Sequence, residues 1–226
     1  MFRVKICGIT NLDDALLASE QGADAIGFVF WRASPRFVPP AVAAAIVARL
    51  SPEVAPVGVF VDETPEVMKQ IARAVGLRYV QLHGSESADI AAQCVVPAIK
   101  AFGVDRRFNI ERLAAYSVAA FLLDARDPQR HGGTGRPIDW GIARTARRFG
   151  RIVLSGGLSP DNVRDAIAAA EPDAVDVSSG VEERPGRKSA EKIRSFMAAV
   201  CDFQRERQGS AATLEPAVRA HDVTPR

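Results

Sequence analysis

The sequence is poor in cysteine. Its 226 residues include three cysteines, Cys7, Cys94 and Cys201, which lie far apart and form no CxxC pair. An odd and sparse set of this kind argues against a disulfide framework and offers no zinc-binding spacing. Unpaired thiols are typical of a reducing compartment, so the sequence predicts a cytoplasmic protein.

Long hydrophobic runs and an excess of one charge are also missing. The N-terminus, MFRVKICG, has no extended apolar signal core, and no run of about 18 apolar residues occurs elsewhere, so no membrane span is expected. Lys and Arg number 29 against 27 Asp and Glu. This balance gives no indication of a nucleic-acid or membrane-surface partner. With 47% hydrophobic residues, the chain can bury one sizeable core in a single α/β domain.

Signatures of metals and cofactors are absent from the sequence. The three histidines, His83, His131 and His221, are scattered and form no HxH or HExxH pattern, so no metal site is expected. No GxGxxG fingerprint follows the first apolar run, and GGTG at 132–135 has the wrong spacing for one. The sequence therefore offers no signature of a metal or dinucleotide site.

What the chain does contain is a regular alternation of short apolar runs and segments with helical periodicity. The candidate strands are 3–7, 24–30, 56–61, 78–83, 97–102, 119–124, 151–155 and 173–178. Such alternation predicts parallel strands joined by right-handed crossovers. Eight units in about 200 residues favour an α/β fold of the closed (β/α)₈ TIM-barrel type over an open doubly wound sheet.

Start and stop signals mark several of the expected helices. Thr64 and Ser159 each precede a proline, which places a capping hydroxyl before a proline at the first helical position. Asp139 can cap the sixth helix. Gly22 and Gly76 lie where helices should end.

The expected catalytic domain spans residues 1–205. Residues 206–226 carry few large apolar side chains and several of Gly, Ser, Thr and Pro. They are predicted to form a disordered tail, with a docking segment as the alternative.

Polar side chains occur at the ends of several candidate strands, where a barrel of this kind has its active site. Period-two alternation places the following side chains on inner strand faces near that end: Lys5, Cys7, Gln81, His83, Asp124, Asp176 and Ser178. Each position alone has an ordinary structural explanation. Together they indicate a site, because a core would need Val and Leu there.

Two glycine-containing loops follow the last two candidate strands. LSGGLSPDN (154–162) contains Gly156 and Gly157, and DVSSGVE (176–182) contains Ser178, Ser179 and Gly180. Glycine lets backbone N–H groups approach an anion closely, and the loops after strands seven and eight often hold phosphate in this fold. One such loop would be an ordinary turn, but the adjacent pair predicts a phosphate site.

The motifs VKICGIT, GADAIGFVF, SPR, VGVFV, VQLHG, LLD, GGTG, DW, LSGGL and DVSSGVE occur in this order along the chain. The set resembles the phosphoribosylanthranilate isomerases of tryptophan biosynthesis, over about residues 2–200. The resemblance implies the Amadori rearrangement of N-(5-phosphoribosyl)anthranilate to 1-(2-carboxyphenylamino)-1-deoxyribulose 5-phosphate, without metal or organic cofactor. The expected partner is this small molecule, and the expected assembly is a monomer or homodimer.

The resemblance also implies residue roles. It makes Cys7 the general base and Asp124 the general acid, with Asp127 as the less favoured acid because it lies in the loop beyond the strand. Arg36 is expected to pair with the anthranilate carboxylate. The remaining expected contacts are Gln81, His83 and Asp176 for substrate, and Gly133, Gly135, Gly156, Gly157, Ser178, Ser179 and Gly180 for phosphate.

The expected chemistry makes opposite demands on the two catalytic groups. An acid near neutrality must keep its proton, which the apolar neighbours of Asp124 would favour. A base at Cys7 must be a thiolate, which Lys5 on the same strand face would favour.

Other functions remain open from the residues alone. A Schiff-base aldolase could use Lys5 or Lys100. A metal-dependent epimerase would need a ligand cluster, and a catalytically silent binding protein would need only the phosphate loops. Acceptance of the related aminoaldose of histidine biosynthesis is also open.

Overall fold

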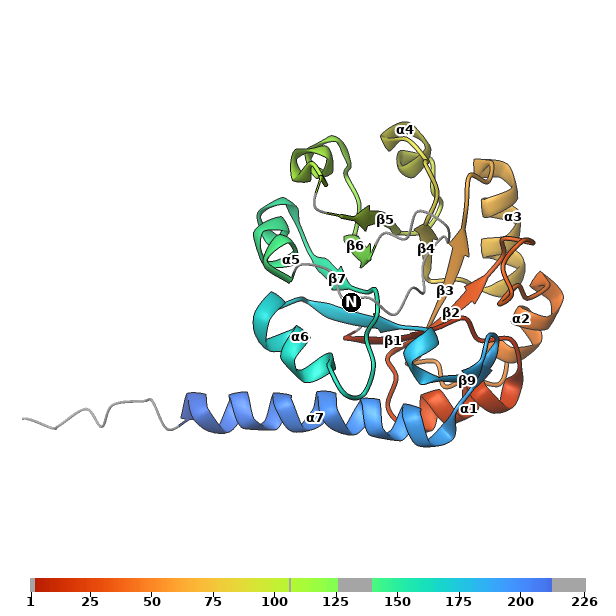
Figure 1. The fold of residues 1–226 in the computed structure, drawn as a ribbon. Coiled ribbons are helices and arrows are strands. Elements are labelled where there is room, and N and C mark those ends of the chain that lie inside the picture. The colour runs from red at the N-terminus through yellow and green to blue at the C-terminus, as the bar shows by residue number, and fades with distance from the viewer. Residues whose placement is uncertain (1–2, 106, 126–139, 213–226) are drawn as a thin grey trace, which may run out of the picture.

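Eight parallel strands close into a barrel in chain order (Figure 1). The structure is a computed structural model that describes residues 3–105, 107–125 and 140–212. The strands are β1 (Val4–Cys7), β2 (Ala25–Val29), β3 (Ala55–Phe60), β4 (Tyr79–Leu82), β5 (Ala98–Val104), β6 (Ala120–Ala125), β7 (Ile152–Leu154) and β8 (Ala174–Val177). Each falls within or overlaps one of the predicted runs, so the predicted strands and the (β/α)₈ architecture are confirmed.

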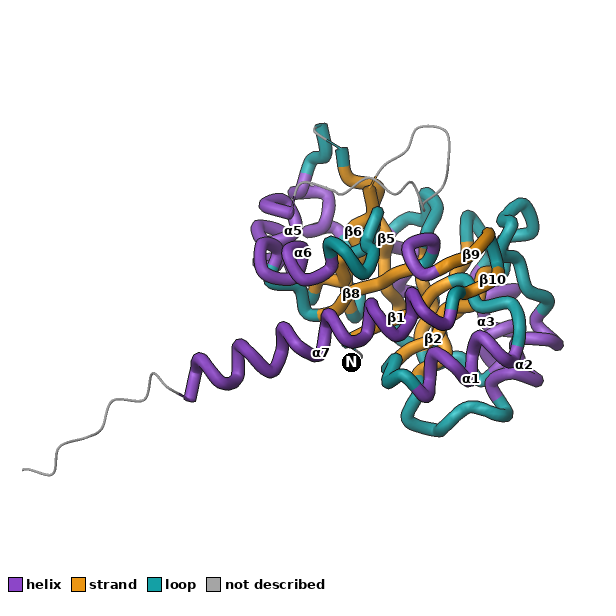
Figure 2. The backbone as a smooth tube through the Cα atoms, turned by 60° about the horizontal axis from the view of Figure 1, so that its bottom comes forward, coloured by secondary structure: helices purple, strands orange, loops and turns teal. Residues whose placement is uncertain are grey.

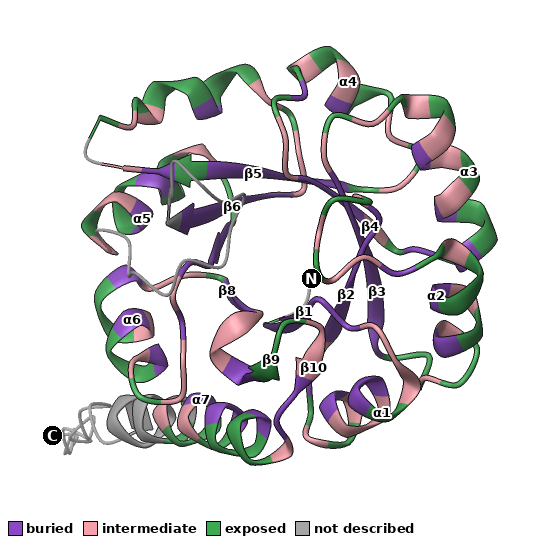
Figure 3. Cartoon of the chain, turned by 45° about the vertical axis from the view of Figure 1, so that its right-hand side comes forward, coloured by how far each residue is buried: buried purple, intermediate pink, exposed green. Residues whose placement is uncertain are grey.

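Helices surround the barrel and cover its outer face (Figure 1). They are α1 (Leu12–Glu20), α2 (Pro40–Val47), α3 (Pro65–Val75), α4 (Ala88–Ala92), the 3₁₀-helix η1 (Ile110–Ala115), α5 (Trp140–Ala146) followed by η2 (Arg147–Phe149), α6 (Val163–Ala170) and α7 (Ala190–Ala212). Figure 3 shows helices buried on the side that faces the strands and exposed on the other side. This pattern follows from the apolar face that each amphipathic helix packs on the sheet.

The predicted helix signals hold in part. The Thr64 hydroxyl caps α3 by accepting from the Val67 N–H at 3.3 Å, and Gly76 ends that helix at φ +76°. The predicted start at Ser159 is wrong, because α6 begins only at Val163. The Asn162 side chain accepts from the Ser159 N–H at 2.9 Å and so holds the intervening residues in a loop. Asp139 lies outside the described residues.

The barrel interior is filled mainly by small residues. The buried interior cluster consists of Ala25, Ala55, Val57, Ile99, Ala101, Ala120, Leu122, Val153 and Ala174. Lys5 is fully buried, although it carries a charge. A second, smaller cluster of Cys7, Val29 and Val59, with Trp31 against it, lies beyond this layer at the carboxyl ends of the strands. The interior is therefore packed, and open space begins at the strand ends.

A short hairpin follows β8 and was not anticipated from the sequence. The 3₁₀-helix η3 (Ser179–Val181) leads into β9 (Glu182–Arg184), which pairs with β10 (Arg187–Lys188) in antiparallel fashion. Gly186 makes the turn at φ +78°. The hairpin leads into α7, which continues past residue 205 to Ala212 and extends away from the barrel (Figure 2). Of the tail predicted for 206–226, residues 206–212 belong to α7, and residues 213–226 lie outside the described residues. Among the described helices, none is both long and apolar enough to span a membrane.

Lys100 supports the barrel wall from outside. It lies between the inward-facing Ile99 and Ala101, so strand alternation points it outward. Its Nζ donates to the carbonyl oxygens of Leu82 at 3.2 Å and Gly84 at 2.8 Å and to Glu86 Oε2 at 2.8 Å. The aldolase alternative for Lys100 does not fit this position, because its ammonium is bound on the side of the strands away from the interior.

Lys100→Met is expected to destabilise the protein by about 3–5 kcal/mol, because it leaves the buried Glu86 carboxylate without its cation. Urea unfolding measures this change. The matched control is Arg147→Met, which breaks an ion pair with Glu171 at 3.3 Å between side chains that are 44% and 34% exposed. That variant should lose only about 0–1 kcal/mol. Equal losses in the two variants would contradict the assignment of Lys100 as a buried structural cation.

Candidate active site

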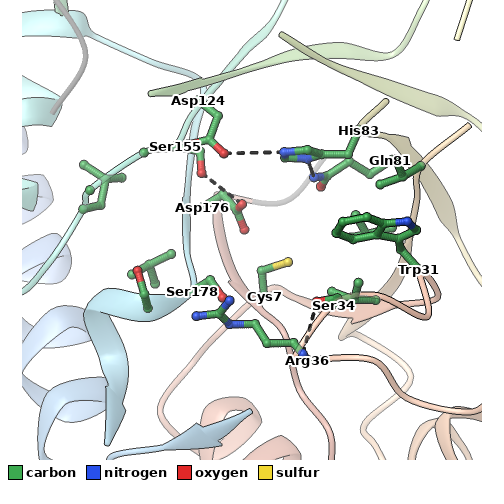
Figure 4. A pocket seen from close by; sticks show the side chains of 18 residues that line it. Cys7, Trp31, Ser34, Arg36, Gln81, His83, Asp124, Ser155, Asp176 and Ser178 are labelled. Atoms are coloured by element: carbon green, nitrogen blue, oxygen red, sulfur yellow. Dashed lines mark hydrogen bonds and ion pairs between the residues drawn. The ribbon is translucent and has the colours of Figure 1, made fainter. Parts of the chain in front are cut away.

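A pocket opens at the carboxyl ends of the barrel strands. It brings together most of the site residues predicted from the sequence: Cys7, Arg36, Gln81, His83, Asp124, Gly156, Gly157, Asp176, Ser178 and Ser179. Figure 4 shows Asp124, His83 and Gln81 along one side of the pocket, and Cys7, Arg36 and Ser178 along the other. Gly180 lies beside the pocket rather than in its lining. Gly133 and Gly135, like Asp127 and His131, lie outside the described residues.

Cys7 is the last residue of β1 and is buried at the pocket floor. Lys5, two residues earlier on the same strand face, acts on the Cys7 thiol through its positive charge, which lowers the pKa of the thiol. Its ammonium also donates to Asp176 Oδ1 at 2.7 Å. Asp176 accepts a second hydrogen bond, at Oδ2, from the Ser155 hydroxyl at 3.2 Å. The thiol therefore lies next to the buried ion pair of Lys5 and Asp176. Ser155, in the loop after β7, holds the carboxylate of that pair.

Burial dominates the protonation of Cys7. It raises the pKa of the thiol, and the negative charge of Asp176 adds to this, so that the opposing effect of Lys5 is outweighed. The pKa of Lys5 is also raised: burial alone would lower it, but the charges of Asp176 and Cys7 prevail. Lys5 therefore lowers the pKa of Cys7, as expected, but burial and Asp176 raise it by more. Lys5 is an ammonium ion bound to Asp176, which makes it a poor candidate for imine formation.

Asp124, His83 and Gln81 form a chain across the opposite side of the pocket. Gln81 Nε2 lies 2.8 Å from His83 Nδ1, and His83 Nε2 lies 3.5 Å from Asp124 Oδ2 (Figure 4). If Gln81 donates to Nδ1, the ring hydrogen is on Nε2 and faces the carboxyl group. Asp124 Oδ1 and Gln81 Oε1 are buried and have no hydrogen-bond partner among the described residues. Both atoms are thus available to a ligand.

Gly27 leaves room on β2 for the side chains of Cys7 and Lys5. A Cβ atom at this position of β2 would lie 2.7 Å from Cys7 Sγ and 3.1 Å from Lys5 Cε. Real Cβ atoms do not tolerate the shorter of these distances. The glycine is therefore required by the side chains of the neighbouring strand rather than by its own backbone conformation.

The two glycine-containing loops pack directly on each other. Gly156 and Gly157 follow β7 at φ +85° and +67°, where glycine is favoured. Gly180 approaches the first loop so closely that a Cβ atom there would lie 1.9 Å from the Leu158 carbonyl oxygen. The Ser178 hydroxyl is buried without a partner among the described residues. This arrangement leaves backbone and hydroxyl groups at the pocket wall that suit an anion.

Arg36 reaches the pocket from the loop after β2. Its Nε and Nη2 donate to Glu182 Oε1 at 2.8 Å and Oε2 at 2.6 Å. Glu182 also accepts from Lys188 Nζ at 3.0 Å. Burial would raise the pKa of Glu182, but the hydrogen bond from Arg36 and the charge of Lys188 lower it. Sequence reasoning found Arg36 and missed both hairpin residues.

The apolar wall of the pocket was also missed from the sequence. Trp31 lies two residues after Val29, the last residue of β2, and Val29 and Val59 line the same side. Val61, Ser34 and Ser155 are also part of the pocket lining. The sequence did offer one signal for this wall. Trp31 immediately follows the predicted strand 24–30, at the end of the barrel that carries the polar groups. Trp31 gives the pocket a flat apolar surface suited to a ring.

These features define the class of protein. Titratable groups and glycine-containing loops gather at the carboxyl ends of the strands, where (β/α)₈-barrel enzymes carry their active sites. Within the described ranges, no group of three or more His, Cys, Asp or Glu side chains could hold a metal ion. The chain therefore has the construction of a (β/α)₈-barrel enzyme.

Comparison with known proteins gives the family. The sequence model of the N-(5'-phosphoribosyl)anthranilate isomerase family matches residues 4–199, so the chain belongs to this family. The chain is 52% identical over 197 residues to N-(5'-phosphoribosyl)anthranilate isomerase of Pelobacter propionicus, with 87% of this chain and 94% of the relative covered.

Solved structures agree with this result. The crystal structure of phosphoribosyl anthranilate isomerase from Thermotoga maritima superposes with a TM-score of 0.82 at 44% identity, covering 89% of this chain and 100% of that one. A second isomerase structure, in complex with reduced 1-(o-carboxyphenylamino)-1-deoxyribulose 5-phosphate, gives a TM-score of 0.79 at 43% identity, with the same coverage of both chains. The predicted family and enzyme class are confirmed.

Gly180→Ala is expected to force the two glycine-containing loops apart and to destabilise the protein by roughly 1–3 kcal/mol, as at other overpacked sites. Thermal or urea unfolding measures the change. Ser179→Ala, at the preceding position where a Cβ is already present, is the control and should cost no more than about 0.5 kcal/mol. Wild-type stability of Gly180→Ala would contradict the close contact with Leu158.

Proposed function

We propose that this isomerase converts N-(5-phosphoribosyl)anthranilate into 1-(2-carboxyphenylamino)-1-deoxyribulose 5-phosphate, with Asp124 as general acid and Cys7 as general base. The observation that carries the proposal is that side chains from β1 and β6, far apart in the sequence, line one pocket beside the two glycine-containing loops. Membership of the isomerase family supports the reaction. The assignment of individual residues rests on the chemistry of this pocket.

The reaction begins with ring opening. Asp124 donates a proton to the furanose oxygen, the bond from C1 to that oxygen breaks, and the nitrogen lone pair forms the C=N bond of a Schiff base. Asp124 is left as a carboxylate, and a ring hydrogen on His83 Nε2, 3.5 Å from Oδ2, would stabilise that charge.

Proton removal follows at C2. The Cys7 thiolate takes this proton, and the electron pair forms a C1=C2 double bond while the Schiff base becomes a neutral enolamine. Tautomerisation to the ketone completes an isomerisation in which no atom is gained or lost. The positive nitrogen stabilises the developing negative charge, so a modest base suffices.

The remaining groups orient the substrate. Arg36 can bind the anthranilate carboxylate with its planar fork, and Trp31 offers a surface for the aromatic ring. The loops that carry Gly156, Gly157, Ser178, Ser179 and Gly180 would hold the phosphate through backbone N–H groups. The orphaned Gln81 Oε1 can accept from a sugar hydroxyl. Asp176, which is bound to Lys5 and Ser155, acts on Cys7 more directly than on the substrate.

Cys7→Ser and Asp124→Asn should each lower kcat by at least ~100-fold, the loss expected when a general acid or base is removed. Consumption of the fluorescent substrate measures turnover, and turnover by the wild-type chain is the primary test of the function. Cys94→Ser, at a half-buried thiol outside the pocket, is the control. Asp127→Asn should retain turnover. Near-wild-type rates in either primary variant would remove that residue from the mechanism.

In Asp124→Asn, where the general acid no longer titrates, the residual kcat/KM should increase with pH across the neutral range. This ratio reports ionisations of the free enzyme, and burial raises the pKa of Cys7 above its ordinary value of 9.0. The thiolate fraction then grows about tenfold per pH unit below that pKa. A steady-state profile between about pH 6 and about pH 9 measures the slope. Adding Cys201→Ser, at an exposed thiol, should leave the slope unchanged. A flat profile in Asp124→Asn would contradict thiolate catalysis.

The cellular setting remains a prediction. We propose a cytoplasmic enzyme whose partner is its small-molecule substrate, with no nucleic-acid or membrane partner. The three cysteines are free thiols, which suits a reducing compartment. Monomer and homodimer both remain open.

A further inference from the structure

The guanidinium of Arg36 is fixed on one side before any ligand arrives. Nε and Nη2 donate to the two oxygens of Glu182, so the carboxylate occupies the side edge of the guanidinium. Among the described residues, Nη1 makes no hydrogen bond, and Nη2 retains a second hydrogen. The end edge formed by Nη1 and Nη2 is therefore left for a second carboxylate, in the bidentate geometry that arginine favours.

Lys188 in turn fixes Glu182. Its Nζ donates to Glu182 Oε1 at 3.0 Å, to the Cys7 carbonyl oxygen at 2.6 Å and to the Ser178 carbonyl oxygen at 3.1 Å. Burial lowers the pKa of Lys188, but three oxygen acceptors require the three hydrogens of an ammonium ion. The same lysine therefore contacts the end of β1, the loop after β8 and the partner of Arg36.

The charges of these residues favour an anionic ligand. Lys188, Glu182 and Arg36 form a row of positive, negative and positive groups, with side chains 0%, 4% and 17% exposed. The row carries one net positive charge, and a ligand carboxylate at the free edge of Arg36 would neutralise it. Without the charge of Glu182, two cations would lie close together in a poorly solvated region.

We propose that Glu182 is a positioning residue that presents the free edge of Arg36 to the pocket and thereby determines preference for ligands with an aryl carboxylate. Neither Glu182 nor Lys188 lines the pocket, so Glu182 acts through Arg36 rather than on the ligand. The inference rests on the proposed function, because it assigns the Arg36 subsite to the anthranilate ring of that substrate.

The test compares two ligands by calorimetry. One is reduced 1-(2-carboxyphenylamino)-1-deoxyribulose 5-phosphate, and the other is the same compound without the ring carboxylate. The wild-type chain should prefer the first by roughly 10- to 100-fold, the gain from a bidentate charged pair. Glu182→Gln should reduce this preference to that of Arg36→Gln, while affinity for the carboxylate-free compound changes by less than about threefold. Because the two residues act as a unit, the double variant should match Arg36→Gln.

Two further variants keep the test decisive. Glu182→Asp keeps the charge beside Lys188 but is one methylene too short to hold the Arg36 fork, so the preference should fall in a chain that still folds. Glu86→Gln makes the same change at an equally buried glutamate, bound to Lys100 at 2.8 Å and outside the pocket. It should lower the melting temperature and leave the preference intact.

The outcomes separate this inference from the function on which it rests. If the wild-type chain consumes the fluorescent substrate but both Glu182 variants keep the wild-type preference, the positioning role is overturned and the isomerase assignment stands. Equal loss of affinity for both compounds would also overturn it, because that result marks a merely structural role. A wild-type chain that neither turns over the substrate nor binds either compound would overturn the proposed function itself.

Discussion

The buried ion pair between Lys5 and Asp176 is the interaction on which both barrel and pocket depend. Lys5 lies on β1 and Asp176 on β8, and they stand opposite each other where the first and last strands pair. The alanine-rich interior leaves space for the long lysine side chain beneath Cys7. Removing either partner would leave an uncompensated charge inside the protein at the point of barrel closure. The same ion pair therefore joins the first and last strands of the barrel and sets the electrostatic environment of the Cys7 thiol.

The strands could be predicted from the sequence because each is a short apolar run between segments of helical periodicity. Period-two alternation then places Cys7, Asp124 and Asp176 on inner strand faces at the same end of the barrel. Whether the pKa of Cys7 is raised or lowered could not be predicted in this way. Lys5 is visible in the sequence as a neighbouring charge, but the burial that outweighs it depends on packing across several strands.

The hairpin of β9 and β10 was not predictable for a related reason. Its sequence, EERPGRK, has the composition of a solvated turn, yet Glu182 and Lys188 are buried. Their burial depends on Arg36, which is 146 residues away from Glu182 in the chain. Local signals also failed at Ser159, where Asn162 provides a competing hydrogen bond. In each case the deciding contact lies beyond the reach of periodicity or capping rules.

The pocket contains buried polar atoms that the described protein leaves unpaired. Gln81 Oε1, Asp124 Oδ1 and Ser178 Oγ each lack a partner among the described residues, although buried polar atoms normally have one. A ligand with suitably placed donors and acceptors could pair with these atoms. The same atoms thus indicate where a sugar phosphate would find its contacts.

The position of Lys188 in the chain bears on how the protein matures during synthesis. Cys7 leaves the ribosome long before Lys188, whose ammonium holds the Cys7 carbonyl oxygen and which lies only two residues before α7. A nascent chain that has completed all eight strands still lacks both Lys188 and the fixed orientation of Arg36. The pocket can therefore reach its final geometry only when translation of the hairpin is complete.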